Sequence, residues 1–271
     1  MIWLASFPRS GNTFFRIVLH EVYGIESSAF RLETELQKDK EYYKSDVVKT
    51  HVLPHQLEPK DPSIPVVYLV RDGRDSVVSL AHHTKDIVQP GSDYYLNMRE
   101  VILARNGAHF GGWGKNVLAW LPRAAVVLRF EDLIEDPIGT VEKLRPIIDL
   151  PEPKSENLPT FEDLREKEAP YGPGRKSQVS DEEYVDKKRQ FFRRGKVGAW
   201  RDEMPLEFQE MFWFFNGEAM RQLGYLDGEV KPDPTLGMRM YKFLDESFGD
   251  RGLVRRAKNR LVAHNWTFDE R

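Results

Sequence analysis

The chain has 271 residues, with 40 lysine and arginine residues against 43 aspartate and glutamate residues and no cysteine. A formal net charge of −3 argues against nucleic-acid binding, and the lack of cysteine excludes disulfides, thiol catalysis and cysteine-based zinc sites. Apolar segments alternate along the chain without a repeat, which favours a single core. The first apolar segment starts at Ile2 without a charged leader, so we expect no signal peptide, no integral membrane segment and a cytoplasmic location.

The start of the chain predicts a phosphate-binding turn between a strand and a helix. Residues 2–6 are apolar enough for a buried strand, and the apolar residues between 14 and 22 have helical spacing. The turn between them reads Phe-Pro-Arg-Ser-Gly-Asn-Thr, and a helix N-terminus with free backbone N–H groups favours an anion. A nucleoside-triphosphate loop has Gly where this chain has Ser6 and Lys where it has Asn12. Because the cation stands inside the turn at Arg9 instead, we expect phosphate binding without a Mg²⁺-bound triphosphate.

A second anion signal follows the next apolar strand. Arg71 comes directly after that strand, at the end where open α/β sheets place their ligands. Asp72 or Asp75 would cap the following helix, and Ser79 lies about two helical turns along it. The alternative is that Arg71 and Arg74 only pair with the two aspartates on a solvated surface.

A third signal lies late in the chain, where residues 191–200 read Phe-Phe-Arg-Arg-Gly-Lys-Val-Gly-Ala-Trp. Two adjacent arginines beside a glycine suit phosphate, because the guanidinium fork donates two parallel hydrogen bonds. A basic surface turn is the alternative for this segment taken alone. Three separate anion signals together indicate a ligand with more than one phosphate group.

Lys49 and His51 form the candidate catalytic pair. Val47 and Val48 predict a short strand that ends near Pro54, and residues two apart on an extended chain point to the same side. An unshifted imidazole titrates near neutral pH, as a general base for a hydroxyl requires, while Lys49 and Arg9 supply fixed cations for developing charge. A lone histidine is more often structural, and His55 remains a weak second candidate for the base.

The rest of the chain adds three expectations. Residues 27–45 are polar and predict a helix near the acceptor, and residues 151–180 are rich in proline, glycine and charge, which favours a mobile lid. Residues 206–223 predict an aromatic amphipathic helix of the core. The basic run at residues 251–260 predicts a solvated helix face, with docking on a partner or a membrane as the alternative.

With these motifs in place, residues 1–225 resemble the sulfotransferases that use 3′-phosphoadenosine 5′-phosphosulfate (PAPS), closest to the cytosolic and bacterial small-molecule type. Five motifs carry the resemblance in order: Phe-Pro-Arg-Ser-Gly-Asn-Thr (7–13), Val-Lys-Thr-His (48–51), Tyr-Leu-Val-Arg-Asp-Gly-Arg-Asp-Ser-Val-Val-Ser (68–79), Phe-Glu-Asp-Leu (130–133) and Arg-Arg-Gly-Lys-Val-Gly-Ala-Trp (193–200). Each motif is modest alone, but five in this order and spacing are specific.

The resemblance implies a role for each matching position. The first loop would hold the 5′-phosphosulfate with Arg9 near the bridging oxygen, aromatic residues would flank the adenine, and other positions would bind the 3′-phosphate. His51 would be the general base, with Lys49 and Arg9 as the other catalytic residues. The residues implied to bind the nucleotide are Arg9, Ser10, Gly11, Asn12, Thr13, Phe14, Arg71, Ser79, Phe130, Thr160, Phe161, Arg193, Arg194 and Gly195.

Taken together, the sequence predicts an α/β protein with one P-loop-type domain, a mainly parallel sheet flanked by helices, over residues 1–225. Residues 226–271 would form a helical extension packed on that domain or on a partner, and would be the surface for any homo-oligomer. The implied activity is sulfuryl transfer from PAPS to a hydroxyl, or less favourably an amine, of a small-molecule acceptor, without a metal and with 3′,5′-bisphosphoadenosine (PAP) as product. A small-molecule or nucleoside kinase with a degenerate loop, or a non-catalytic nucleotide-binding protein, are the alternatives.

Overall fold

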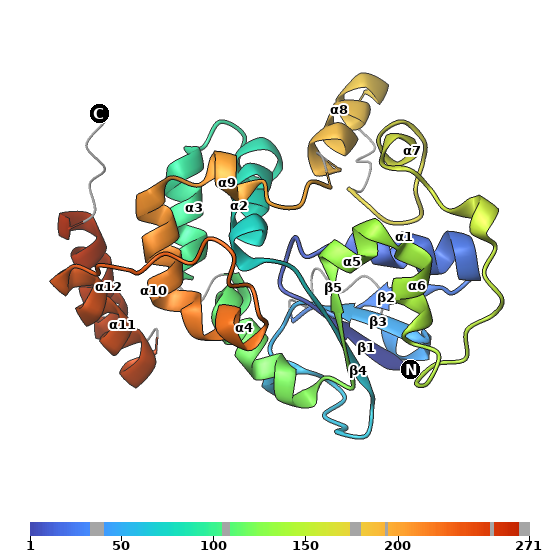
Figure 1. Ribbon diagram of the computed structural model, residues 1–271, viewed down its shortest axis with the longest axis horizontal. Coiled ribbons are helices and arrows are strands. Elements are labelled where there is room, and N and C mark those ends of the chain that lie inside the picture. The colour runs from blue at the N-terminus through green and yellow to red at the C-terminus, as the bar shows by residue number, and fades with distance from the viewer. Residues whose placement is uncertain (33–40, 105–108, 174–179, 193–194, 250–251, 266–271) are drawn as a thin grey trace.

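A five-stranded, wholly parallel sheet lies in the first half of the chain (Figure 1). The computed structural model describes residues 1–32, 41–104, 109–173, 180–192, 195–249 and 252–265. The strand order is β2-β3-β1-β4-β5, so the chain builds one side of β1 first and then crosses to the other side. The strands are β1 (Ile2–Ala5), β2 (Ser27–Ala29), β3 (Val47–Thr50), β4 (Val66–Val70) and β5 (Val126–Arg129).

The strand order creates a crevice at the carboxyl ends of β1 and β4, where the connections of the sheet diverge. β1 continues through its helix toward β3 and β2, whereas β4 continues toward β5. Open α/β sheets bind ligands at such a point, because the loops turn away from each other there. The phosphate-loop motif follows β1 and Arg71 follows β4, so the two predicted anion signals lie side by side at this crevice.

Helices cover both faces of the sheet, which explains why its strands are apolar on both sides. Ile2 and Leu4 of β1 join one hydrophobic cluster with helix α1, while Trp3 and Ala5 join the other cluster with α2, α4 and α10. The helices are α1 (Asn12–Tyr23), α2 (Gly73–His83), α3 (Tyr94–Leu103), α4 (Trp113–Trp120), α5 (Phe130–Glu135), α6 (Pro137–Glu142), α7 (Phe161–Glu166), α8 (Asp181–Phe191), α9 (Trp200–Glu203), α10 (Leu206–Gln222), α11 (Leu236–Phe248) and α12 (Gly252–Asn265).

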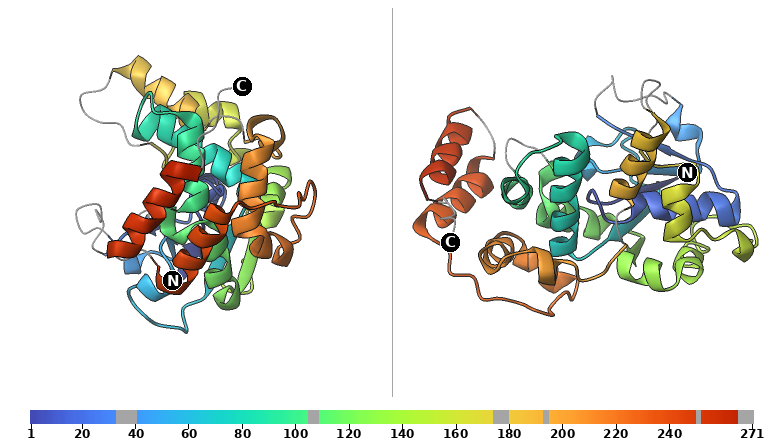
Figure 2. Two further views of the ribbon diagram at one scale, coloured as in Figure 1. Left: turned by 90° about the vertical axis from the view of Figure 1, so that its left-hand side faces the viewer. Right: turned by 90° about the horizontal axis from the view of Figure 1, so that it is seen from above.

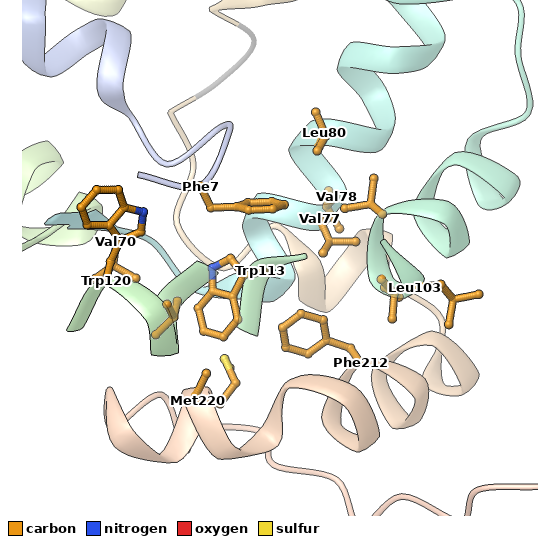
Figure 3. Packing of buried hydrophobic residues seen from close by; sticks show 14 of the residues in the cluster. Phe7, Val70, Val77, Val78, Leu80, Leu103, Trp113, Trp120, Phe212 and Met220 are labelled. Carbon is orange, nitrogen blue, oxygen red and sulfur yellow. The ribbon is translucent and has the colours of Figure 1, made fainter. Parts of the chain in front are cut away.

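The larger cluster packs aromatic side chains between the sheet and α10 (Figure 3). Trp113 of α4 is buried against Phe212 of α10, with the ring centroids 5.8 Å apart, and its indole N–H donates to the carbonyl oxygen of Arg71. A Cβ atom on Gly73 would lie 2.5 Å from both rings, so only glycine allows α2 to start this close to α10. This packing holds the end of β4, and with it Arg71, in a fixed position.

One sequence prediction about local structure is corrected, and another stays a prediction. Residues 27–45 were predicted to be helical, but Ser27–Ala29 form the edge strand β2, which pairs with β3 in parallel register. Tertiary pairing with β3 stabilises this short polar strand, a contact that local propensity does not report. Residues 151–180 contain the helix α7, residues 174–179 lie outside the described part of the chain, and the role of this segment as a mobile lid stays a prediction.

The C-terminal helices α11 and α12 pack against each other at the end of the molecule remote from the sheet (Figure 2). Tyr241 of α11 donates to the carbonyl oxygen of Leu103, and Lys242 donates to that of Phe214. Asp245 pairs with Lys258 of α12 at 2.6 Å. Self-association through this extension stays a prediction. None of the helices that the structure describes has the length and apolarity needed to cross a membrane.

Candidate active site

The turn between β1 and α1 has the geometry of an anion cradle. Its backbone enters the left-handed region at Arg9 (φ 66°) and again at Gly11 (φ 91°), and no described side chain caps the first turn of α1. A Cβ atom on Gly11 would lie 2.3 Å from the ring of Phe130, so both the conformation and the space require glycine. The buried Ser10 hydroxyl has no hydrogen-bond partner within the described residues. Uncapped N–H groups and a free hydroxyl fit a phosphate.

The side chain of Asn12 ties the turn to the end of β1. Its side-chain amide donates to the Ser6 hydroxyl at 3.1 Å and points toward the carbonyl oxygen of Leu4 at 3.5 Å. The residue at the position of the triphosphate-loop lysine is therefore directed toward β1, and its contribution to an anion would come from its backbone N–H at the start of α1.

Arg71 lies at the crevice, with only 8% of its surface exposed. Its guanidinium donates to the carbonyl oxygens of Arg9 (3.2 Å) and Lys196 (2.9 Å) and covers the ring of Phe130 at 4.4 Å. The Asp75 carboxylate, 3.7 Å away, accepts the backbone N–H groups of Gly198 and Trp200. Residues 196–200, at the end of the late basic segment, are thereby held beside Arg71.

The Arg9 side chain contacts Ser79 and Phe191. Its Nε donates to the Ser79 hydroxyl at 3.2 Å and its Nη2 to the carbonyl oxygen of Phe191 at 2.7 Å. The guanidinium also covers the ring of Phe191 at 4.5 Å. Arg9 thus lies beside Ser79, a residue implied for the 3′-phosphate, and its implied role near the bridging oxygen stays a prediction.

Three phenylalanines form the apolar walls. Phe14 and Phe161 lie with ring centroids 5.1 Å apart, and Phe130 lies between Gly11 and Arg71. Gly195 (φ 58°) passes so close to Phe161 that a Cβ atom would lie 2.5 Å from the ring. Thr160 does not join them, because it is exposed and caps α7, its hydroxyl accepting the N–H of Asp163. Arg193 and Arg194 lie outside the described residues.

His51 and Lys49 come together at the end of β3. The His51 Nδ1 is 2.7 Å from the carbonyl oxygen of Ser6, an acceptor that requires Nδ1 to carry the proton and leaves Nε2 as the proton acceptor. Burial, followed by the charge of Lys49, holds the pKa of His51 well below its usual range. Burial, followed by the charges of Arg16 and Arg31, lowers the pKa of Lys49 to about 7. The sequence had suggested an unshifted imidazole, whereas the structure keeps His51 neutral to lower pH. His55 is exposed and does not line the cavity.

Most of the predicted site residues line one cavity of about 440 Å³, among them Arg9, Lys49, His51, Arg71 and Phe130, whereas Ser10 and Thr160 do not line it. Several of its lining residues were not among the predicted site residues: Arg16, Arg31, Leu80, His83, Phe110, Phe191, Phe192 and Lys196. Arg16 could have been predicted from the sequence to line the site, because it is an arginine within an apolar helical pattern. It lies four residues after Asn12, on the same face of the helix. No sequence pattern predicted that Phe110 would line the cavity, where its ring centroid is 5.6 Å from that of His51.

Comparisons with known proteins show the family of the chain. Residues 1–224 match the family model described as the sulfotransferase domain. The chain is 25% identical to flavonol 3-sulfotransferase of Flaveria bidentis (77% of this chain, 78% of the relative) and 26% identical to cytosolic sulfotransferase 1 of Danio rerio (78% and 79%). Its fold is similar to mouse sulfotransferase SULT7A1 complexed with PAP, at 21% identity and TM-score 0.63, over 81% of this chain and 83% of that one. Retinol dehydratase with androsterone and PAP matches at 18% identity and TM-score 0.54, over 85% and 82%.

Proposed function

The chain belongs to the sulfotransferase domain family, and from this premise we propose that it transfers the sulfuryl group of PAPS to a hydroxyl of a small-molecule acceptor with His51 as general base. Family membership favours sulfuryl transfer over the kinase and the passive nucleotide-binding protein that the sequence alone left open. The finer assignments rest on the cavity and the groups that line it.

The contact between His51 and Ser6 is the observation that carries the proposal. Because Nδ1–H donates to the carbonyl oxygen of Ser6, Nε2 is left as the basic nitrogen. The same contact joins the base to the phosphate loop, since Ser6 is the first residue of that loop. An acceptor hydroxyl at Nε2 would therefore lie close to an anion held at the start of α1, as an in-line transfer needs.

PAPS supplies the sulfuryl group: a bond forms between its sulfur and the acceptor oxygen while the bond from sulfur to the bridging oxygen breaks, and PAP leaves. His51 Nε2 takes the proton of the acceptor hydroxyl. Lys49 supplies positive charge beside the sulfuryl oxygens, and the N–H groups at the start of α1 stabilise charge on the leaving phosphate. The chain's own groups thus account for each proton and charge in the step without a metal.

The cavity fits a nucleotide with two phosphate positions. Arg71, Arg9 and Ser79 offer donors for a 3′-phosphate at the crevice, while the first turn of α1 offers N–H groups for the 5′-phosphate. The phenylalanine walls suit an adenine ring, because a flat ring packs well against aromatic faces. PAP in the two solved structures named above is consistent with this assignment.

A thermal-shift comparison in metal-free buffer tests the nucleotide. PAP at 100 times its Kd should stabilise the protein by about 2.7 kcal/mol, whereas ADP, or ATP with Mg²⁺, should give a much smaller shift. Selective stabilisation by ATP with Mg²⁺ would point to a kinase and refute the proposal.

Replacement of His51 tests the base. His51→Ala should lower turnover by about 10² to 10⁴-fold, the usual contribution of a positioned acid–base group, and should leave PAP affinity nearly unchanged. His55→Ala is the matched control, because His55 is exposed and outside the cavity, and it should behave like the wild-type protein. Turnover within a few-fold of wild type in folded His51→Ala protein would remove His51 as the base.

A further inference from the structure

One face of α4 donates side-chain hydrogen bonds to the backbone at the carboxyl ends of two strands. Trp113, Asn116 and Trp120 are three and four residues apart, so their side chains lie on the same side of the helix. The Trp113 indole N–H donates to the carbonyl oxygen of Arg71, after β4, and the Trp120 indole N–H donates to that of Val52, after β3, at 3.1 Å. Both indoles lie in the larger hydrophobic cluster (Figure 3). This helix face therefore joins the end of β3 to the end of β4.

Asn116 lies between the two tryptophans, is fully buried and uses both ends of its carboxamide. Its Nδ2 donates to the carbonyl oxygens of His51 and Phe110, each at 3.2 Å. Its Oδ1 accepts the hydroxyl of Tyr68 at 3.0 Å. Two carbonyl oxygens on one side require the NH₂ end of the carboxamide there, which leaves Oδ1 for the hydroxyl. A buried amide with these three contacts holds its partners in one arrangement.

His51 depends on contacts outside the sheet, because it is the first residue after β3. Its ring is held through Nδ1 by the Ser6 carbonyl oxygen at 2.7 Å, and its backbone is held by Asn116. Only two side-chain torsions separate an imidazole ring from its backbone, so fixing both ends determines the direction of Nε2. That direction decides whether an acceptor hydroxyl meets the base, and a misplacement of about 1 Å can cost about 10²-fold in rate.

Phe110, the second backbone partner of Asn116, has an unfavourable conformation for a phenylalanine. Its φ of 56° lies in the left-handed region. Its ring lines the cavity, with the centroid 5.6 Å from that of His51. The hydrogen bond from Asn116 to its carbonyl oxygen stabilises this conformation. Backbone strain of this kind persists only where neighbouring contacts compensate it, and it is typical of functional positions.

We propose that Asn116 is a positioning residue for the transfer, and that it aims the Nε2 of His51 and the ring of Phe110 at the acceptor. On the same helix face, Trp113 holds Arg71, so that α4 sets the base and the predicted 3′-phosphate site against each other. The proposal rests on the proposed function, because it takes His51 as the base. A purely structural role, in which the buried amide only joins α4 to the sheet, is the competing explanation.

Proton exchange at the His51 ring separates the two explanations without an acceptor. The Nδ1 proton is protected by the contact with Ser6, and its NMR signal is the one that disappears in His51→Ala. Asn116→Leu keeps the branched side-chain shape and removes both N–H donors. In this variant we expect the Nδ1 proton to exchange with water about tenfold or more faster, which corresponds to the loss of about one hydrogen bond. The pKa of His51, lowered first by burial and then by Lys49, should rise toward its ordinary value as water reaches the ring.

Asn216→Leu is the matched control, because Asn216 of α10 is also a buried asparagine that contacts α4. Its Oδ1 accepts the N–H of Gly114 at 2.9 Å, and its Nδ2 donates to the carbonyl oxygen of Phe212 at 3.1 Å. Both variants should lower the free energy of unfolding in urea, but only Asn116→Leu should change the His51 ring. Equal acceleration of exchange in the two variants, or exchange and a pKa like wild type in folded Asn116→Leu, would overturn the proposal.

Asn116→Asp keeps the test decisive if Asn116→Leu does not fold. It keeps the size of asparagine and offers at most one O–H donor in place of two N–H donors. Exchange of the His51 Nδ1 proton should then be about threefold or more faster than in wild type, a smaller change in the same direction. Unchanged exchange in folded Asn116→Asp would count against the positioning role as firmly as in the leucine variant.

Calorimetric titration with PAP in metal-free buffer shows whether the effect is confined to the base. The Kd of PAP in Asn116→Leu should stay within about threefold of the wild-type value, since Trp113 still holds Arg71. A larger loss would mean that Asn116 supports the whole cavity, which is the structural explanation. Failure of PAP to bind to the wild-type protein would instead refute the proposed function, and the exchange measurement would not be affected by it.

Discussion

Replacement of Arg71 by alanine should separate recognition of the 3′-phosphate from support of the loop. Arg71 donates to the carbonyl oxygens of Arg9 and Lys196, so its loss will loosen the cavity for any nucleotide to a small degree. A 3′-phosphate would in addition lose a charge-assisted hydrogen bond at a side chain that is only 9% exposed. Such bonds are worth about 1.5 to 3 kcal/mol, which corresponds to about 10 to 150-fold in Kd. The loss should therefore be large for PAP and small for 5′-AMP.

Isothermal titration in metal-free buffer measures both affinities. For Arg71→Ala we expect the Kd of PAP to rise at least about tenfold and that of 5′-AMP to change by less than about threefold, because only PAP carries the 3′-phosphate. Arg71→Lys is the matched control, since it keeps the charge and removes the planar fork, and it should give an intermediate loss for PAP. Equal losses for the two nucleotides would show that Arg71 supports the loop and does not read the 3′-phosphate.

Three further outcomes are expected. Arg9→Lys should retain more activity than Arg9→Ala in steady-state assays, since it keeps the cation. If both variants are equally inactive, activity depends more on the guanidinium contacts to Ser79 and the Phe191 carbonyl oxygen than on the charge. Arg74→Ala should lower the free energy of unfolding in urea by about 3 to 5 kcal/mol, because it leaves Asp72 buried without its ion-pair partner; a loss below about 1 kcal/mol would contradict this. In the ligand-free protein, an NMR titration should give a pKa for the His51 imidazole well below its ordinary value. Bound PAP should raise that pKa, because the phosphate charge favours the protonated ring. A midpoint at or above 6.5 without ligand would be inconsistent with the buried cationic surroundings of His51.

The sequence predicted the features that depend on local pattern. Short continuous apolar runs identified the strands that precede the phosphate loop and Arg71, and the aromatic helix at residues 206–223 appears as α10 (Leu206–Gln222). Asp72 or Asp75 was expected to cap the helix, and Asp72 is the cap, since its carboxylate accepts the N–H of Arg74. The pairing of Arg71 and Arg74 with aspartates was also foreseen, but in the structure these pairs are buried rather than solvated. The order of the motifs was sufficient to indicate the family.

Only the tertiary structure decided how the charged side chains are distributed within the cavity. Arg9, at a left-handed backbone position, donates to the hydroxyl of Ser79, a residue 70 positions later in the chain. Arg16, Arg31 and Lys49 are distant in sequence, and they meet because β2 pairs with β3 beneath α1. A local pattern specifies which residues are apolar or can end a helix. The electrostatic character of a cavity depends instead on strand order and on burial. Strand order determines which charged residues become neighbours although they are far apart in the chain, and burial determines how much each charge costs in free energy.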